Sequence, residues 1–134
     1  MSTMPVTVMP STSVSALITL FDRHSDIDAF PVIADDGVLR GIVSRLDILR
    51  AFRPDEELRM PNPRRVGETR VSAIMRHGVI SVEPDDPLFA AADLMVETRF
   101  QSLPVVHRGG GEPVLVGILS RQALLQGLFS AGLK

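Results

Sequence analysis

Two polar residues, Ser44 and Asp47, stand where an aliphatic segment meets a helical pattern, and their spacing suits the start of a helix. In such a capping box the hydroxyl accepts a hydrogen bond from the third helical amide, and the acid accepts one from the serine's own amide. The junction returns 76 residues later, with Ser120 matching Ser44 and Ala123 matching Asp47. Because the second copy still has the pattern of a helix start, we predict that the acid is not required merely to begin a helix.

An internal repeat surrounds this junction. Pro31 and Pro104 lie in similar aliphatic segments 73 residues apart, and residues 6–8 are echoed by residues 80–82 at a spacing of 74. Three echoes in the same order at nearly one spacing indicate two copies of one unit. Each copy is too small to fold well alone, so we expect the 134 residues to form one module of two repeats.

The composition is that of an ordinary globular protein, with 45% hydrophobic and 22% charged residues. A net charge of −2 gives no electrostatic basis for binding nucleic acid or an anionic membrane. The absence of cysteine excludes disulfides and thiolate metal sites and fits a cytoplasmic protein. No apolar run approaches the roughly 18 residues that a membrane-spanning helix needs, so we expect no direct membrane contact.

Other common chemistries lack their patterns. The histidines His24, His77 and His107 are far apart and form no recognisable metal site with an acid. The glycines 109–111 are followed by Pro113 and a predicted strand, which indicates a hairpin loop and not a phosphate-binding loop. There is no Gly-x-Ser-x-Gly nucleophile pattern, and no titratable pair accompanies a nucleophile. We therefore expect no catalysis, no metal and no required cofactor.

Hydrophobic spacing predicts the order strand, helix, strand, strand, helix in each half, an α/β fold. In the first half we expect strands at 6–8, 29–34 and 38–43, a helix beginning at residue 14, and a helix over 45–52. In the second half we expect a helical turn at 71–75, strands at 79–82, 102–107 and 114–119, a helix after residue 87, and a helix over 121–129.

Residues 53–70 have a different texture, because Pro54, Pro61 and Pro63 interrupt a polar, charged stretch. Three prolines cannot lie in one continuous helix, so we predict an exposed linker. The expected organisation is a first repeat at 1–58, a linker at 59–70 and a second repeat at 71–134. The first repeat lacks a counterpart of the helical turn at 71–75, which favours a chain cut from a longer one.

The repeated unit resembles the tandem CBS domain pair, or Bateman module, over nearly the whole chain. The segments of the first repeat that match are Pro31-Val32, the hairpin Asp35-Asp36-Gly37, and 41–47; those of the second are Ala73-Ile74-Met75, Pro104-Val105 and 117–121. The resemblance implies two repeats packed with pseudo-two-fold symmetry and two clefts between them. It implies a regulatory module that binds an adenosine-containing ligand (AMP, ADP, ATP or S-adenosylmethionine), often as a homodimer. An attached or partner protein, or a missing domain, would be the regulated effector.

The resemblance also assigns roles to residues of the first repeat. Asp47 matches the carboxylate that binds the ribose, since an ionised carboxylate can accept both hydroxyls of a cis-diol. Ser44 matches the hydroxyl that faces a phosphate at the helix start. Thr7 matches the strand at the edge of the adenine, and Ala29 and Phe30 match the lining of the base pocket.

The second repeat departs from the family pattern, because Ala123 stands where the ribose-binding acid belongs while Ser120 and Arg121 remain. A nucleotide there would lose about 1.5–3 kcal/mol of charge-assisted hydrogen bonding. We therefore expect one competent cleft built around Asp47 and a second cleft that is weak or empty.

Alternatives stay open for several of these residues. Asp47 fits a helix cap as well as a ribose ligand, and one residue can do both. Arg45 and Arg121 follow the two serines and suit either phosphate contact or simple solvation. Arg76 and His77, just before a strand of the second repeat, are further candidates to face the clefts. The alternative function is a structural dimerisation module that binds no nucleotide.

Overall fold

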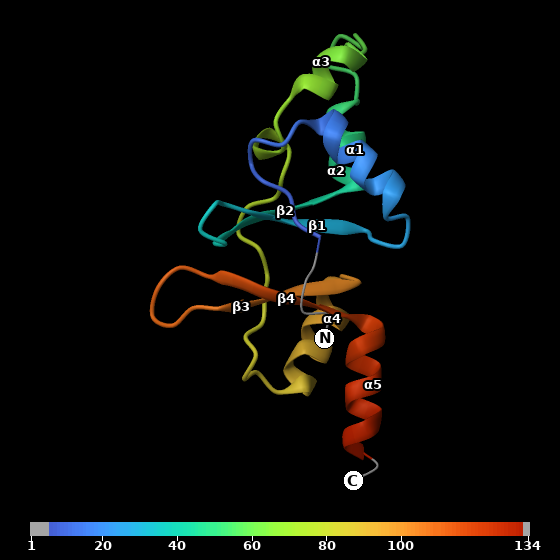
Figure 1. Ribbon diagram of the computed structural model, residues 1–134. Coiled ribbons are helices and arrows are strands. Elements are labelled where there is room, and N and C mark those ends of the chain that lie inside the picture. The colour runs from blue at the N-terminus through green and yellow to red at the C-terminus, as the bar shows by residue number, and fades with distance from the viewer. Residues whose placement is uncertain (1–5, 133–134) are drawn as a thin grey trace. The chain divides into compact units, whose positions relative to one another are not determined.

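Both halves of the chain contain helices and strands in the predicted order, as Figure 1 shows for the computed structural model, which describes residues 6–132. The first half forms α1 (Val14–Arg23), β1 (Ala29–Ile33), β2 (Leu39–Ser44) and α2 (Arg45–Ala51). The second half forms α4 (Leu88–Thr98), β3 (Ser102–His107), β4 (Val114–Ser120) and α5 (Arg121–Gly132). Between them lie α3 (Pro63–Glu68) and the short 3-10 helix η1 (Val71–Ala73). The predicted α/β fold is confirmed.

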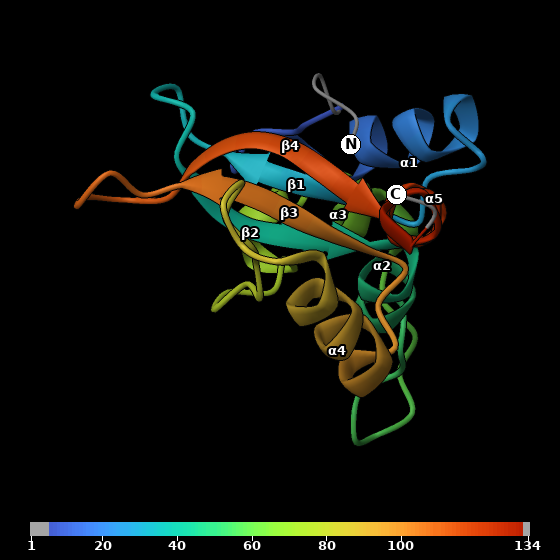
Figure 2. The same ribbon diagram turned by 90° about the horizontal axis from the view of Figure 1, so that it is seen from below.

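The strands form two hairpins. β1 pairs with β2, and β3 pairs with β4 in a separate two-stranded sheet. The β3–β4 pair is antiparallel, with Ser102 opposite Ser120 and an irregularity in register between Val105 and Val106. Figure 2 shows β3 and β4 side by side along their length. Because Ser44 and Ser120 end β2 and β4, each hairpin delivers the chain directly into the following helix.

The strands predicted at 6–8 and 79–82 are each reduced to a single parallel bridge, Val8 with Val32 and Val82 with Val105. Val8 N–H donates to Pro31 C=O (3.0 Å), and Val8 C=O accepts from Ile33 N–H (2.9 Å). In the second repeat, Val82 N–H donates to Pro104 C=O (3.0 Å), and Val82 C=O accepts from Val106 N–H (2.8 Å).

Prolines explain why these two ladders stop after one residue. In a parallel ladder the next hydrogen bond in the chain direction would come from the N–H two residues after Val8 or Val82. Those two positions are Pro10 and Pro84. In the opposite direction the next hydrogen bond would come from the N–H of the residue before Val32 or Val105. Those two residues are Pro31 and Pro104. Since proline has no N–H, neither ladder can be extended in either direction.

By their internal contacts the described residues divide into two compact units. Residues 6–36 and 40–79 form what we call the N-terminal unit, and residues 37–39 and 80–132 form the C-terminal unit. Segment 71–79, predicted to open the second repeat, thus makes its contacts in the N-terminal unit. The predicted repeat boundaries at 58 and 71 stay predictions.

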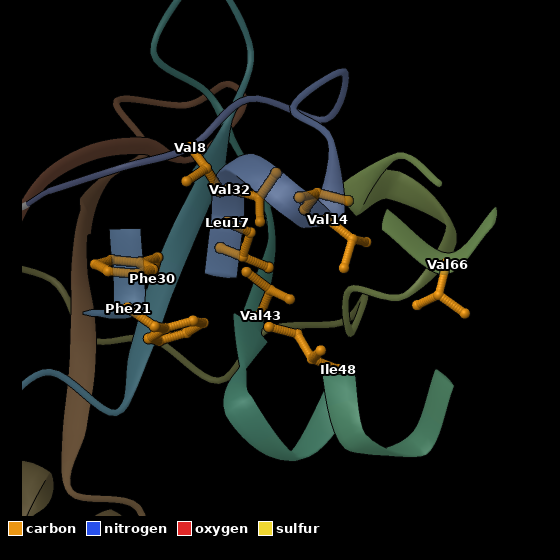
Figure 3. Packing of buried hydrophobic residues seen from close by; sticks show 10 residues of the cluster. Val8, Val14, Leu17, Phe21, Phe30, Val32, Val43, Ile48 and Val66 are labelled. Atoms are coloured by element: carbon orange, nitrogen blue, oxygen red, sulfur yellow. The ribbon is translucent and has the colours of Figure 1, made fainter. Parts of the chain in front are cut away.

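Each unit has its own hydrophobic core. In the N-terminal unit the core lies between α1, the β1–β2 strands and α2, as Figure 3 shows, and consists of Val8, Val14, Leu17, Phe21, Phe30, Val32, Val43, Ile48, Val66 and Val71. The core of the C-terminal unit consists of Val82, Ala91, Met95, Leu103, Val105, Leu119 and Leu124. The alternation of buried and exposed residues in β2 places Val43 in the core and leaves Ser44 partly exposed at the strand end.

The stretch predicted to be an exposed linker contains a packed helix, α3. Asn62 caps it by accepting a hydrogen bond from Arg64 N–H, and Pro63 occupies the first helical position, where no N–H is needed. Val66 is buried in the core of the N-terminal unit. The chain after α3 pairs with the start of α1, since Val14 N–H donates to Thr69 C=O (2.8 Å) and Val71 N–H to Thr12 C=O (2.7 Å). Most residues of 62–70 are exposed, as expected for a linker, but Val66 is buried, and the linker boundaries at 59–70 stay a prediction.

Candidate functional site

The carboxylate of Asp47 is buried at the start of α2, with 4% of the residue exposed. Its Oδ2 accepts hydrogen bonds from the N–H of Ser44 (2.8 Å) and from the Ser44 hydroxyl (3.0 Å). In return, Asp47 N–H donates to Ser44 Oγ (3.3 Å). The predicted capping box is thus confirmed, and it fixes one oxygen of the carboxylate through bonds that lie within a single helical turn.

The other oxygen, Oδ1, is bound by two arginines. Arg50, one turn along α2, donates through Nη1 at 3.3 Å, and Arg76 donates through Nε at 3.3 Å. The Arg50 side chain is 51% exposed and that of Arg76 is 42% exposed, whereas the Asp47 side chain is 3% exposed. The bonds to Oδ1 are therefore longer than those to Oδ2, and their donors come from half-exposed side chains.

A close approach of two backbone segments places Arg76 beside Asp47. Ile42 N–H donates to Arg76 C=O (3.0 Å), and Arg76 N–H donates to Ile42 C=O (2.8 Å). A Cβ atom on the neighbouring Gly41 would lie 2.6 Å from that same Arg76 oxygen and 2.9 Å from Met75 Sδ. Glycine at position 41 is thus the residue that allows segment 75–76 to lie against β2. The sequence indicated Arg76 only as a candidate facing a cleft, and gave no sign of its pairing with Asp47.

Arg45, predicted to contact phosphate or solvent, binds main-chain carbonyls. Its Nη1 donates to Ile27 C=O (2.6 Å), and its Nη2 donates to the carbonyls of Phe21 (3.0 Å) and His24 (3.4 Å). Its guanidinium also lies 4.6 Å from the centre of the Phe21 ring. Arg45 thereby ties the first turn of α2 to the C-terminal end of α1, where carbonyls lack helical partners.

Arg121 does the same in the other repeat. Its Nε donates to Phe100 C=O (3.0 Å) and its Nη2 to Arg99 C=O (2.6 Å), at the end of α4. Arg45 and Arg121, which match each other in the sequence repeat, therefore make equivalent hydrogen bonds to main-chain carbonyls. The local sequence pattern could not reveal these bonds, because the carbonyls lie 18 to 24 residues away from the arginines. Phosphate contact by either arginine stays a prediction.

The remaining predicted site residues differ in exposure. Thr7 and Ala29 are partly exposed. Phe30 is fully buried, and its ring packs on Phe21 with 4.5 Å between ring centres and on His24 at 6.2 Å. Its side chain belongs to the core, so a ligand can meet Phe30 only through its main chain. The roles of these three residues in ligand binding stay predictions.

The matching junction of the C-terminal unit is a cap without an acid. Ser120 Oγ accepts a hydrogen bond from Ala123 N–H at 3.1 Å, and α5 follows. The prediction that the acid is not needed to begin this helix is confirmed. Asp47 thus adds a buried carboxylate to a junction that can form without one.

Within residues 6–132 no group of three or more His, Cys, Asp or Glu side chains is placed to hold a metal ion. Over the same residues no helix has the length and apolar character needed to cross a bilayer.

The family model for the CBS domain matches residues 1–54 and 71–130. Protein MJ1225 of Methanocaldococcus jannaschii has a similar structure, with a TM-score of 0.83 and 22% identity over 95% of this chain and 45% of that one. At this identity the similarity concerns the fold alone.

Two further solved structures contain adenine nucleotides. CBSX2, solved in complex with AMP, has a TM-score of 0.72 and 31% identity over 96% of this chain and 90% of its own. The cytosolic domain of the Mg²⁺ channel MgtE, solved in complex with ATP, has a TM-score of 0.70 and 26% identity over 92% of this chain and 44% of its own. The chain thus spans less than half of the MJ1225 and MgtE chains, but nearly all of CBSX2.

Proposed function

The chain belongs to the CBS domain family, and on that premise we propose that its N-terminal unit binds an adenosine-containing ligand at Asp47 and regulates a partner protein. One observation carries the proposal: a buried carboxylate with one oxygen fixed by Ser44 and the other bound by two half-exposed arginines. The AMP bound to CBSX2 and the ATP bound to the MgtE domain support an adenine nucleotide as the ligand class.

The chemistry of the site suits a ribose. A carboxylate oxygen has two lone pairs, so Oδ1 can accept the two hydroxyls of a cis-diol while Oδ2 keeps its bonds to Ser44. Hydrogen bonds to an ionised acceptor contribute about 1.5–3 kcal/mol each, which is the scale of discrimination expected against a ligand without the diol. Following the family pattern, we place the adenine beside Thr7 and the main chain of Ala29 and Phe30, and a phosphate near Ser44.

Regulation follows if the ligand prefers one state of the protein over another. A ligand shifts such an equilibrium only by its difference in affinity for the two states. We propose that the module acts as a homodimer and that the regulated activity belongs to an attached or partner protein. Because Ala123 replaces the acid in the second repeat, we expect ligand binding near Ser120 and Arg121 to be weak or absent.

A second function, a structural module that binds no nucleotide, is favoured by one feature of the same site. Four donors from Ser44, Arg50 and Arg76 bind the Asp47 carboxylate, so its acceptor positions can be satisfied within the protein. In this case Asp47 serves as a helix cap and an ion-pair partner, and nothing else.

A thermal-shift panel separates the two functions. AMP, ADP, ATP, S-adenosylmethionine and NAD are titrated against the wild type and Asp47→Ala. A ligand at about 100 times its dissociation constant stabilises the folded state by about 2.7 kcal/mol, which appears as a clear rise in melting temperature. We expect a concentration-dependent rise in the wild type that Asp47→Ala abolishes.

The matched control is Ser13→Ala, which removes the cap of α1, where Ser13 Oγ accepts from Ala16 N–H at 3.1 Å. Loss of either cap lowers the free energy of unfolding by about 0.5–2 kcal/mol. Ser13→Ala should therefore lower the melting temperature as Asp47→Ala does, yet keep the shift caused by the ligand. A flat panel for the wild type, after removal of any nucleotide that copurifies, contradicts the sensor and favours the structural module.

A further inference from the structure

All the acceptor positions of the Asp47 carboxylate are used by donors of the protein itself. A carboxylate offers about four lone-pair sites. Two on Oδ2 are used by Ser44 N–H and Oγ–H, and two on Oδ1 are used by Arg50 Nη1 and Arg76 Nε. A ribose diol can therefore bind only by replacing two of these four donors.

The geometry determines which two donors give way. The bonds to Oδ2 are short, at 2.8 and 3.0 Å, and their donors belong to the capping residue itself. The bonds to Oδ1 are both 3.3 Å long and come from side chains that are 51% and 42% exposed, so water can solvate the guanidinium groups once they leave. Displacing the arginines therefore needs less free energy than breaking the capping box.

We propose that Arg50 and Arg76 compete with the ligand for Oδ1 of Asp47, so that each arginine lowers ligand affinity. This inference rests on the proposed binding of an adenosine-containing ligand at Asp47. Arg50 and Arg76 act as affinity-determining residues that occupy the carboxylate until the ligand replaces them.

The two arginines leave without moving the backbone that holds them. Arg50 belongs to α2, and Arg76 stays paired to Ile42 through both of its main-chain hydrogen bonds (3.0 and 2.8 Å). Only side-chain torsions must change, which is a rapid motion for half-exposed residues.

The test measures affinity for adenosine and for AMP by calorimetry, on the wild type, Arg50→Met, Arg76→Met and the double variant. Methionine keeps an unbranched apolar stem and removes the donor. Because the bonds to Oδ1 are long and their donors are half-exposed, we expect each single variant to bind both ligands about two- to fivefold more tightly. The double variant should show roughly the product of the two effects.

The control is Arg64→Met, which removes an arginine of the same charge from an exposed pair with Glu68, at 3.4 Å in α3. It should leave both affinities unchanged. Unchanged or weaker adenosine binding in Arg50→Met and Arg76→Met overturns the competition. A loss of AMP affinity with adenosine unaffected also overturns it, because that pattern belongs to arginines that contact the phosphate.

A measurement on the wild type covers the case in which a variant does not fold. The Nε–H proton of Arg76 is the donor to Oδ1, so its exchange with water should accelerate when adenosine saturates the protein, as followed by NMR. Slower or unchanged exchange contradicts displacement.

The outcomes also separate this inference from the proposed function. Wild-type binding without any tightening in the variants removes the competition and leaves the function intact. Binding by the variants but not by the wild type supports both. If neither the wild type nor the variants bind any adenosine-containing ligand, the proposed function fails, and the competition fails with it.

Discussion

Replacing Gly41 by alanine tests the close packing that positions Arg76. The added Cβ would lie 2.6 Å from Arg76 C=O, 2.9 Å from Met75 Sδ and 3.1 Å from Met75 Cγ. A methionine side chain can rotate away, but the Arg76 oxygen belongs to the backbone and is held by the Ile42 N–H at 3.0 Å. Segment 75–76 must therefore retreat from β2 by several tenths of an ångström.

The size of the effect follows from two terms. Overpacking a close contact of this kind costs about 1–3 kcal/mol. If the retreat also breaks the two hydrogen bonds between Ile42 and Arg76, each contributes a further 0.5–1.5 kcal/mol or so. Partial relaxation makes the two terms overlap, and we expect Gly41→Ala to lower the free energy of unfolding by about 2–4 kcal/mol.

Urea unfolding followed by circular dichroism suits this test, because the sequence has no Trp or Tyr to serve as a fluorescent probe. The matched control is Gly67→Ala in α3, where the new Cβ would meet Ser15 Cβ at 3.5 Å, an ordinary contact. Alanine in a helix is favoured over glycine, so this variant should be as stable as the wild type or about 0.4–1 kcal/mol more stable. Equal stability of Gly41→Ala and the wild type would refute the packing argument.

Two further substitutions test other contacts. Arg45→Met should lower the free energy of unfolding in urea by about 1.5–3 kcal/mol, because three carbonyls lose a charged donor, and unchanged stability would contradict this role. Calorimetry with AMP on the same variant tests the phosphate contact predicted for Arg45. Phe30→Ala should cost about 3–5 kcal/mol in the same unfolding assay, since the ring is fully buried against Phe21, and a loss below about 1 kcal/mol would show that the ring is not part of the core.

Much of the fold could be predicted from the sequence because its determinants are local. The helices after Ser13, Ser44 and Ser120 begin where a serine hydroxyl can accept an amide proton from the same turn. The β1 and β3 strands are apolar runs that contain a proline followed by valine, and each pairs with the strand after it. The repeat then strengthened each assignment, because each element was found twice in the same order.

Two local predictions needed a correction that depends on pairing register. The expected strands at 6–8 and 79–82 are single bridges, and the prolines that limit them are visible in the sequence. A proline ends a ladder only if it stands where an N–H must be donated, so the pairing of Val8 with Val32 must be known before Pro10 and Pro31 can be recognised as the cause. The helix α3 was not predicted from the sequence, because it depends on the packing of Val66 into the core of the N-terminal unit.

At the candidate site, the sequence by itself determined the capping box of Ser44 and Asp47, since both partners lie within one helical turn. Only the tertiary structure decided what binds the other carboxylate oxygen, because Arg76 lies 29 residues away in sequence and reaches Asp47 through the close approach at Gly41. It also decided that Arg45 and Arg121 bind the carbonyls at the ends of α1 and α4. The physical reason is the same in each case: a long side chain finds its partner by the packing of distant segments, and local spacing does not encode that packing.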